Sequence, residues 1–196
     1  MNSEINLRDK ILQAACNLIE EQGMTHFTLE NIAHRANVSK GGLLYHFPSK
    51  EILVQAMIEL FLKELKSSLR KDFLLSSQEN DRTIQSINWL KNYINVCFNQ
   101  KIHLNQYKYA ILAALTMDPK FLLPVRKFIN ESQEEILSLD FSTLATIIRL
   151  TCEGLWLSEL FGFQMVDDKT RVNIKQKLFD LLNDFELHSK SPESIH

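Results

Sequence analysis

Residues 28–51 read TLENIAHRANVSKGGLLYHFPSKE, and their pattern predicts two short helices joined by a tight turn. Thr28 stands where a side-chain oxygen can cap the N-terminus of a helix over 29–36. Ser39 stands in the same relation to a second helix over 40–47. Two such helices after a longer one predict a helix-turn-helix unit, whose second helix enters the major groove of DNA. The alternative is an ordinary helical subdomain with the same caps.

The predicted second helix has a composition that suits close approach to DNA. Gly41 and Gly42 form helices poorly, but their lack of a side chain lets the backbone approach a base edge. Lys40 lies in the first turn, where a cation opposes the helix dipole and can reach a guanine edge or a phosphate. Residues 25–50 carry three basic side chains and one acidic side chain, a net charge of +2, in a chain whose net charge is −2. We therefore expect a local basic surface here.

Polar side chains around this helix can donate hydrogen bonds to phosphates. Thr28 is one of them, because it lies beside the exposed backbone N–H groups of a helix N-terminus. The predicted DNA-contacting residues are Thr28, Ser39, Lys40, Gly41, Gly42, Tyr45, His46 and Lys50.

The rest of the chain also has a helical pattern, so we predict an all-α fold. The 196 residues include only five glycines and four prolines, and apolar residues recur at helical spacing. Residues 76–82 are polar and predict a loop, and residues 189–196 predict a disordered tail. The remaining predicted helices span 7–22, 50–70, 82–99, 104–117, 119–138, 142–162 and 168–187.

The composition also argues against several classes of protein. No apolar stretch approaches the roughly 20 residues of a membrane span, and no signal peptide is recognisable. We therefore expect a cytoplasmic protein without a membrane partner. Cys16, Cys97 and Cys152 are distant in sequence and fit buried, reduced thiols better than a disulfide or an oxidant sensor. No phosphate-binding loop, nucleophile elbow or pair of metal ligands is recognisable, so we expect neither an enzyme nor a cofactor or metal site.

The segment from Thr28 to Glu51 closely resembles the DNA-binding signature of the TetR family of transcriptional regulators, and the resemblance extends over residues 7–55. It implies an all-α homodimer with a three-helix N-terminal helix-turn-helix domain (1–50) and a larger helical domain for ligand binding and dimerisation (51–188). Thr28, Lys40, Gly41, Tyr45, His46 and Lys50 match positions that contact DNA in the family. Asn37 stands where glycine is frequent, and Gly42 where threonine or serine is common, which removes a potential hydroxyl contact.

The chain beyond the helix-turn-helix segment offers candidates for a ligand pocket and a dimer surface. Aromatic, methionine and acidic residues of its helices could line a pocket, although such residues more often form a core. For Glu153, an ion pair with Arg149 one turn earlier is favoured over contact with a cationic ligand. The pocket candidates are Met57, Phe61, Trp89, Tyr93, Phe98, Tyr107, Met117, Glu153 and Trp156. The dimer candidates, for which a monomeric core is the alternative, are Leu150, Leu157, Leu178, Leu181, Leu182 and Phe185.

The resemblance, together with these features, implies a dimeric transcriptional repressor that a small molecule releases from a near-palindromic DNA operator. An activator, an architectural DNA-binding dimer without an effector, and a helical carrier of small molecules that has lost DNA affinity are the alternatives. The residues do not identify the effector, the operator or the regulated genes.

Overall fold

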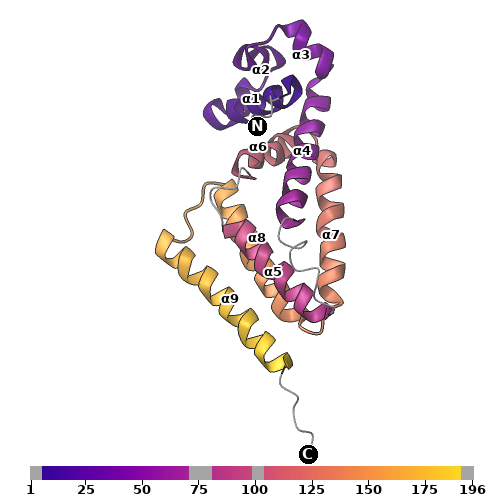
Figure 1. Cartoon of the computed structure of the whole chain (residues 1–196). Helices are drawn as coiled ribbons and strands as arrows, with labels where there is room; N and C mark the ends of the chain where they lie inside the picture. The colour runs from indigo at the N-terminus through magenta and orange to yellow at the C-terminus, as the bar shows by residue number, and fades with distance from the viewer. Residues whose placement is uncertain (1–5, 71–80, 99–103, 191–196) are drawn as a thin grey trace, which may run out of the picture. The chain divides into compact units, whose positions relative to one another are not determined.

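The computed structural model describes residues 6–70, 81–98 and 104–190, with only the backbone described for Arg70, residues 104–107 and Lys190. These ranges contain nine α-helices and two short 3-10 helices, so the predicted all-α fold is confirmed (Figure 1). The 3-10 helices are η1 (Met24–His26) and η2 (Pro119–Leu122). The α-helices are α1 (Leu7–Gln22), α2 (Leu29–Ala36), α3 (Lys40–His46), α4 (Lys50–Arg70), α5 (Arg82–Phe98), α6 (Leu104–Met117), α7 (Leu123–Leu137), α8 (Ser142–Leu160) and α9 (Asp168–Lys190).

Most helix ends lie within two residues of the predicted ones, and the largest difference lies between residues 119 and 138. One predicted helix there is instead η2 followed by α7. The N–H of Leu123 donates to the carbonyl of Lys120, three residues back. Pro124, the second residue of α7, has no N–H and so cannot donate to the carbonyl of Lys120 four residues back. At the other end of the chain, α9 reaches Lys190, three residues beyond the predicted end and into the predicted tail.

The described helices belong to two compact units, which we treat separately. Unit 1 comprises residues 1–65 and 103–130, and unit 2 comprises residues 66–102 and 131–196. The helix α4 begins in unit 1 and continues into unit 2. This division follows contacts within the chain, and the domain ranges expected from sequence remain a prediction about function. Within the described ranges, no helix is long and apolar enough to cross a membrane.

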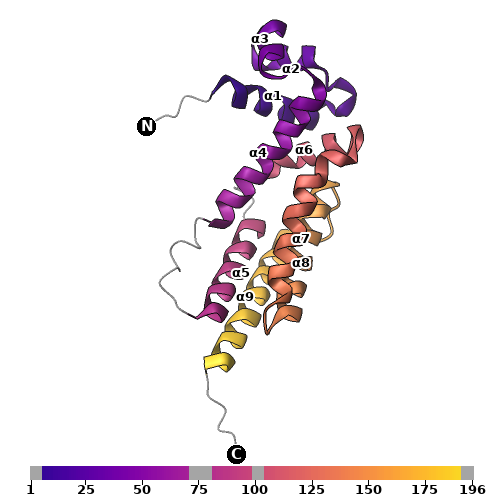
Figure 2. The same cartoon turned by 90° about the vertical axis from the view of Figure 1, so that its right-hand side faces the viewer.

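Unit 1 is built around α1, which packs against α2 and α6, while α2 packs against α3 (Figure 2). A hydrogen bond also joins α1 and α6: Tyr109 Oη donates to Glu20 Oε1 at 3.0 Å. The apolar stripes of these helices meet in a core that excludes water. Large side chains buried in this core include Ile11, Leu12, Phe27, Ile32, Leu43, Phe47, Leu53, Val54, Met57 and Ile58.

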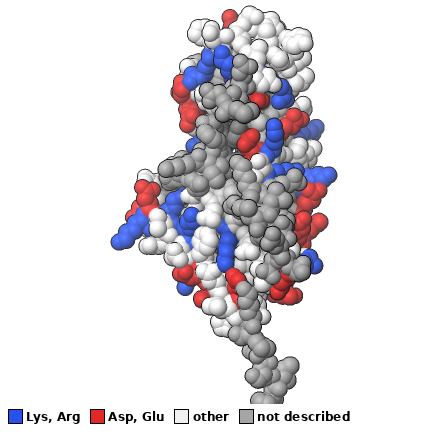
Figure 3. Space-filling view, in the orientation of Figure 1, with Lys and Arg blue, Asp and Glu red and all other residues white. Residues whose placement is uncertain are grey.

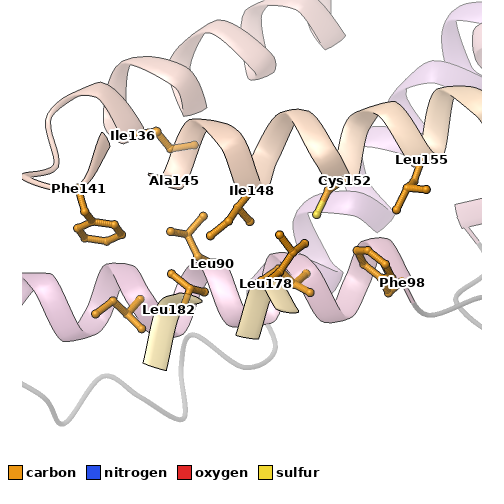
Figure 4. Close-up of a cluster of buried hydrophobic side chains, with 12 residues drawn as sticks. Leu90, Phe98, Ile136, Phe141, Ala145, Ile148, Cys152, Leu155, Leu178 and Leu182 are labelled. Atoms are coloured by element: carbon orange, nitrogen blue, oxygen red, sulfur yellow. The ribbon is translucent and has the colours of Figure 1, made fainter. Parts of the chain in front are cut away.

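In unit 2, α5 packs against both α8 and α9. Their apolar side chains interlock in a continuous cluster, which Figure 4 shows between the helices. Lys91 of α5 also pairs with Glu186 of α9, with Nζ and Oε2 2.9 Å apart. The fully or nearly buried members of the cluster are Ile87, Leu90, Ile94, Phe98, Ile136, Phe141, Ala145, Ile148, Cys152, Leu155, Leu178 and Leu182.

Candidate nucleic-acid interface

The helix α3 is held at its start by the predicted caps. Thr28 Oγ1 accepts the N–H of Asn31 at 3.2 Å and caps α2, and Ser39 Oγ accepts the N–H of Gly42 at 3.0 Å and caps α3. Between the two helices, Asn37 takes the left-handed conformation with φ of 53°, which asparagine tolerates better than most residues. Each hydroxyl accepts from its own helix and retains a hydrogen that it can donate to a phosphate.

One face of α3 is turned away from the core of unit 1. Leu43 and Phe47 are 0% and 1% exposed and form the buried side. The opposite side presents four exposed residues at helical spacing, which we call the α3 face: Lys40, Gly41, Leu44 and Tyr45. Tyr45 is 84% exposed, so its hydroxyl is available to a partner outside the chain.

The structure brings most of the predicted DNA contacts to this face or its edges. Gly42 and His46 are half-buried at its edge, and the His46 ring packs edge-on against the Tyr45 ring with centroids 5.2 Å apart. Lys50 is also half-buried, and its Nζ lies 5.0 Å from the centroid of the Phe27 ring. Thr28 is exposed at the start of α2.

The two glycines of α3 differ in what surrounds them. A Cβ added to Gly42 would lie 3.2 Å from Ser39 Oγ, so a side chain there would crowd the cap. A Cβ added to Gly41 would meet no atom within 4 Å. The fold therefore explains a small residue at position 42 but not at position 41, where glycine leaves the backbone open to the outside.

Sequence reasoning missed Leu44, which lies on the α3 face and is 36% exposed. A signal was available, because Leu43 and Phe47 alone complete the buried stripe of so short a helix. A leucine between them and off that stripe is not required for the core.

The basic surface is smaller than the count of charges predicts. Arg35 forms an ion pair with Glu21 of α1, so this cation is partly neutralised within the chain. Acidic and basic side chains are interspersed over the face shown in Figure 3, and few of either surround the end where α3 lies. Of the four residues of the α3 face, Lys40 is the one that carries a charge.

Among the pocket candidates of unit 2, the Glu153 carboxylate is paired with an arginine of the same helix. Arg149 Nε donates to Glu153 Oε1 at 2.6 Å, and Arg149 Nη1 donates to Gln133 Oε1 at 2.9 Å. The favoured ion pair is thereby confirmed. Trp89 and Tyr93 stack with ring centroids 5.5 Å apart, and burial raises the pKa of the Tyr93 hydroxyl. The other two candidates of this unit are Phe98, which is buried, and Trp156, which is half-buried.

The remaining pocket candidates belong to unit 1. Met57 and Phe61 are buried, and Met117 is half-buried. Tyr107 falls outside the residues whose side chains the structure describes. Because the candidates are divided between two units, a shared pocket remains a prediction.

The dimer candidates separate into buried and exposed groups. Leu178 and Leu182 are 5% and 0% exposed within one chain. They belong to the core cluster of unit 2, which gives them no surface to offer a partner. Leu181 and Phe185 are half-buried. Leu150 and Leu157 of α8 are 63% and 45% exposed, so among the dimer candidates these two are available to a partner chain.

The three cysteines form no disulfide bond in the structure. Burial raises the pKa of Cys16 to about 12, which suppresses its reactive thiolate. Cys152 is also buried, and a hydrogen bond with Cys97 together with burial raises its pKa. Among the described residues, no three or more His, Cys, Asp or Glu side chains gather in a way that could hold a metal ion.

Comparison with known proteins gives matches for both halves of the chain. Residues 11–57 match the family model described as bacterial regulatory proteins, tetR family, and residues 88–183 match a tetracyclin repressor-like C-terminal domain. The biofilm operon negative transcriptional regulator IcaR of Staphylococcus aureus is 24% identical over 187 residues, which are 91% of this chain and 98% of IcaR. The nucleoid occlusion factor SlmA of Vibrio cholerae is 34% identical over 73 residues, 37% of each chain.

Solved structures share the fold. A transcriptional regulator from Rhodococcus sp. Rha1 has a TM-score of 0.64 at 13% identity and covers 90% of this chain and 96% of its own. The multidrug binding protein EbrR complexed with malachite green has a TM-score of 0.57 at 17% identity and covers 89% of this chain and 96% of its own. With both family models matched and the helix-turn-helix geometry in place, the chain belongs to the TetR family of bacterial transcriptional regulators.

Proposed function

We propose that this chain is a sequence-specific repressor that acts on DNA in the cytoplasm as a homodimer and is released by a small molecule. The observation that carries the proposal is the α3 face, where predicted DNA contacts are exposed on a helix whose other side is fully packed. Family members are transcription factors, and the proposal includes no catalysis.

The α3 face suits the major groove. Lys40 and the open backbone at Gly41 would meet base edges, while Thr28, Tyr45, His46 and Lys50 would bind phosphates and fix the register. If a dimer neutralises about six to eight phosphates, the logarithm of its affinity falls with the logarithm of salt concentration at a slope of about −5 to −7.

Dimerisation through α8 is supported by a stripe along that helix. Ile147, Leu150, Gly154 and Leu157 are exposed at alternating spacings of three and four residues, and we call them the α8 stripe. A Cβ at Gly154 would meet no atom within 4 Å, so a second helix could approach closely there. Apolar residues at this spacing are typical of a helix that packs against another helix. Two copies would place two α3 helices about 34 Å apart in successive major grooves.

The repressor role and the effector rest on the relatives. IcaR is a negative transcriptional regulator, and EbrR is a multidrug binding protein. Release of this chain by a hundredfold loss of operator affinity requires about 2.7 kcal/mol of differential binding. The helix α4, which is continuous from unit 1 into unit 2, is the element through which a ligand could change the spacing of the two α3 helices.

Selection of genomic DNA fragments by the purified protein tests the proposal. At about 0.15 M salt we expect enrichment of a near-palindromic sequence by the wild type and by a Leu137→Ala control, but not by Tyr45→Ala. A folded dimer that enriches no sequence contradicts DNA recognition and favours a small-molecule carrier.

The selected sequence, placed ahead of a reporter gene, then tests the direction of regulation. We expect the protein to lower expression, whereas a rise indicates an activator. We also expect the small-molecule fraction of a cell extract to weaken binding. Binding that no extract weakens favours an architectural role.

A further inference from the structure

We infer that Leu44 is a specificity-determining residue that reads the methyl group of a thymine in the major groove. This inference rests on the proposed DNA binding and adds the class of base that the α3 face selects. It begins from the exposure of Leu44 in a helix whose buried stripe is already complete.

The residues around Leu44 show which part of the helix surface its side chain shares. Gly41 precedes it by three residues, so both lie on one side of α3. Because a Cβ at Gly41 would have no neighbour within 4 Å, the surface beside Leu44 is open down to the backbone. Tyr45, which is 84% exposed, follows Gly41 by four residues, so it flanks the same open backbone. The backbone at Gly41 is therefore the floor of a small notch, with Leu44 as its apolar wall and Tyr45 as its other wall.

The chemistry of the major groove offers one apolar group to such a notch. Guanine, cytosine and adenine present hydrogen-bond donors or acceptors there, whereas thymine also presents its C5-methyl group. A leucine can donate and accept no hydrogen bond and would leave a polar base edge unpaired. Lys40, one turn before Leu44, remains available for a guanine or a phosphate.

The test removes the methyl group from the DNA rather than from the protein. After an operator has been selected, each thymine of a half-site is replaced in turn by deoxyuridine, which keeps the base pair and lacks only the methyl. We expect wild-type affinity to fall about fourfold at one thymine per half-site, the factor that corresponds to burying one methyl group. The same replacement should change the affinity of Leu44→Ala by less than about 1.5-fold.

Matched variants separate the methyl contact from changes in DNA shape or in folding. Leu44→Met keeps an apolar side chain and should retain the fourfold loss. Leu44→Gln, a second variant in case Leu44→Ala folds poorly, should lose it. An equal loss for wild type, Leu44→Ala and Leu44→Gln overturns the inference, because DNA shape then explains the effect. The absence of any sensitive thymine in a well-defined operator also overturns it, whereas the failure to select an operator would count against the proposed function itself.

Discussion

The helices α3 and α8 differ in length but share one feature, exposed apolar side chains beside a glycine. Each presents exposed apolar side chains that its own unit does not bury, namely Leu44 on α3 and Leu150 and Leu157 on α8. Each also contains a glycine, Gly41 or Gly154, around which an added Cβ would meet nothing within 4 Å. Within one chain, part of each of these leucines and the space around each glycine is left uncovered.

The difference lies in what accompanies the apolar side chains. The α3 face lies on a helix of seven residues and presents a lysine and a tyrosine hydroxyl beside its leucine, which suit the mixed polar and apolar edge of a major groove. The α8 stripe extends over a helix of 19 residues at the spacing of a helix–helix seam. Exposed apolar residues thus indicate a binding partner. The residues beside them indicate whether that partner is DNA, as for α3, or a second helix, as for α8.

The largest expected effect comes from placing a charge in the α8 stripe. Leu150→Asp should raise the dissociation constant of the dimer more than a hundredfold, because a lone charge in an apolar interface costs about 3 kcal/mol or more. Light scattering at micromolar concentration should then give a monomer mass. Leu137 is 62% exposed, close to the 63% of Leu150, so Leu137→Asp is a matched control that should remain dimeric. A dimer mass for Leu150→Asp would place the interface elsewhere.

A smaller loss is expected when the Tyr45 hydroxyl is removed. Tyr45→Phe should weaken operator binding by about tenfold to a hundredfold, because a hydrogen bond to a charged group contributes about 1.5–3 kcal/mol. Its melting temperature should match that of the wild type, since the side chain is 84% exposed. Unchanged affinity in a fluorescence-anisotropy titration would show that the hydroxyl contacts no phosphate.

Gly41→Ala should move stability and binding in opposite directions. Alanine forms helices better than glycine by up to about 1 kcal/mol, and no atom lies within 4 Å of the new Cβ. The melting temperature should therefore rise by about 2–4 °C while operator affinity falls. If affinity is retained, the backbone at Gly41 does not approach DNA closely.

The smallest effect is expected from oxidation. With the pKa of Cys16 near 12, about one thiol in ten thousand is ionised at pH 8, and the fraction grows only as pH rises toward 12. The pKa of Cys152 is raised as well. Operator affinity at pH 8 should thus be unchanged after brief treatment with hydrogen peroxide. A loss that a thiol reductant reverses, and that Cys152→Ser prevents, would reveal a redox response.

The sequence predicted where the helices begin and end better than it predicted which residues they bury. The caps at Thr28 and Ser39 act between residues three apart, so local chemistry was enough to locate α2 and α3. The core position of Leu182 was missed because its stripe on α9 meets α5 and α8 only after the chain has folded back. Leu44 is different, because its position off the stripe of Leu43 and Phe47 could have been recognised from helical spacing alone.

A hydroxyl-radical footprint of the protein on its selected operator tests most directly whether two α3 faces, joined through α8, read one DNA site. Two protected segments about 10 base pairs apart on one side of the duplex are the predicted result, with both lost in Leu150→Asp. A single protected segment, or a pattern that Leu150→Asp leaves unchanged, would contradict the account.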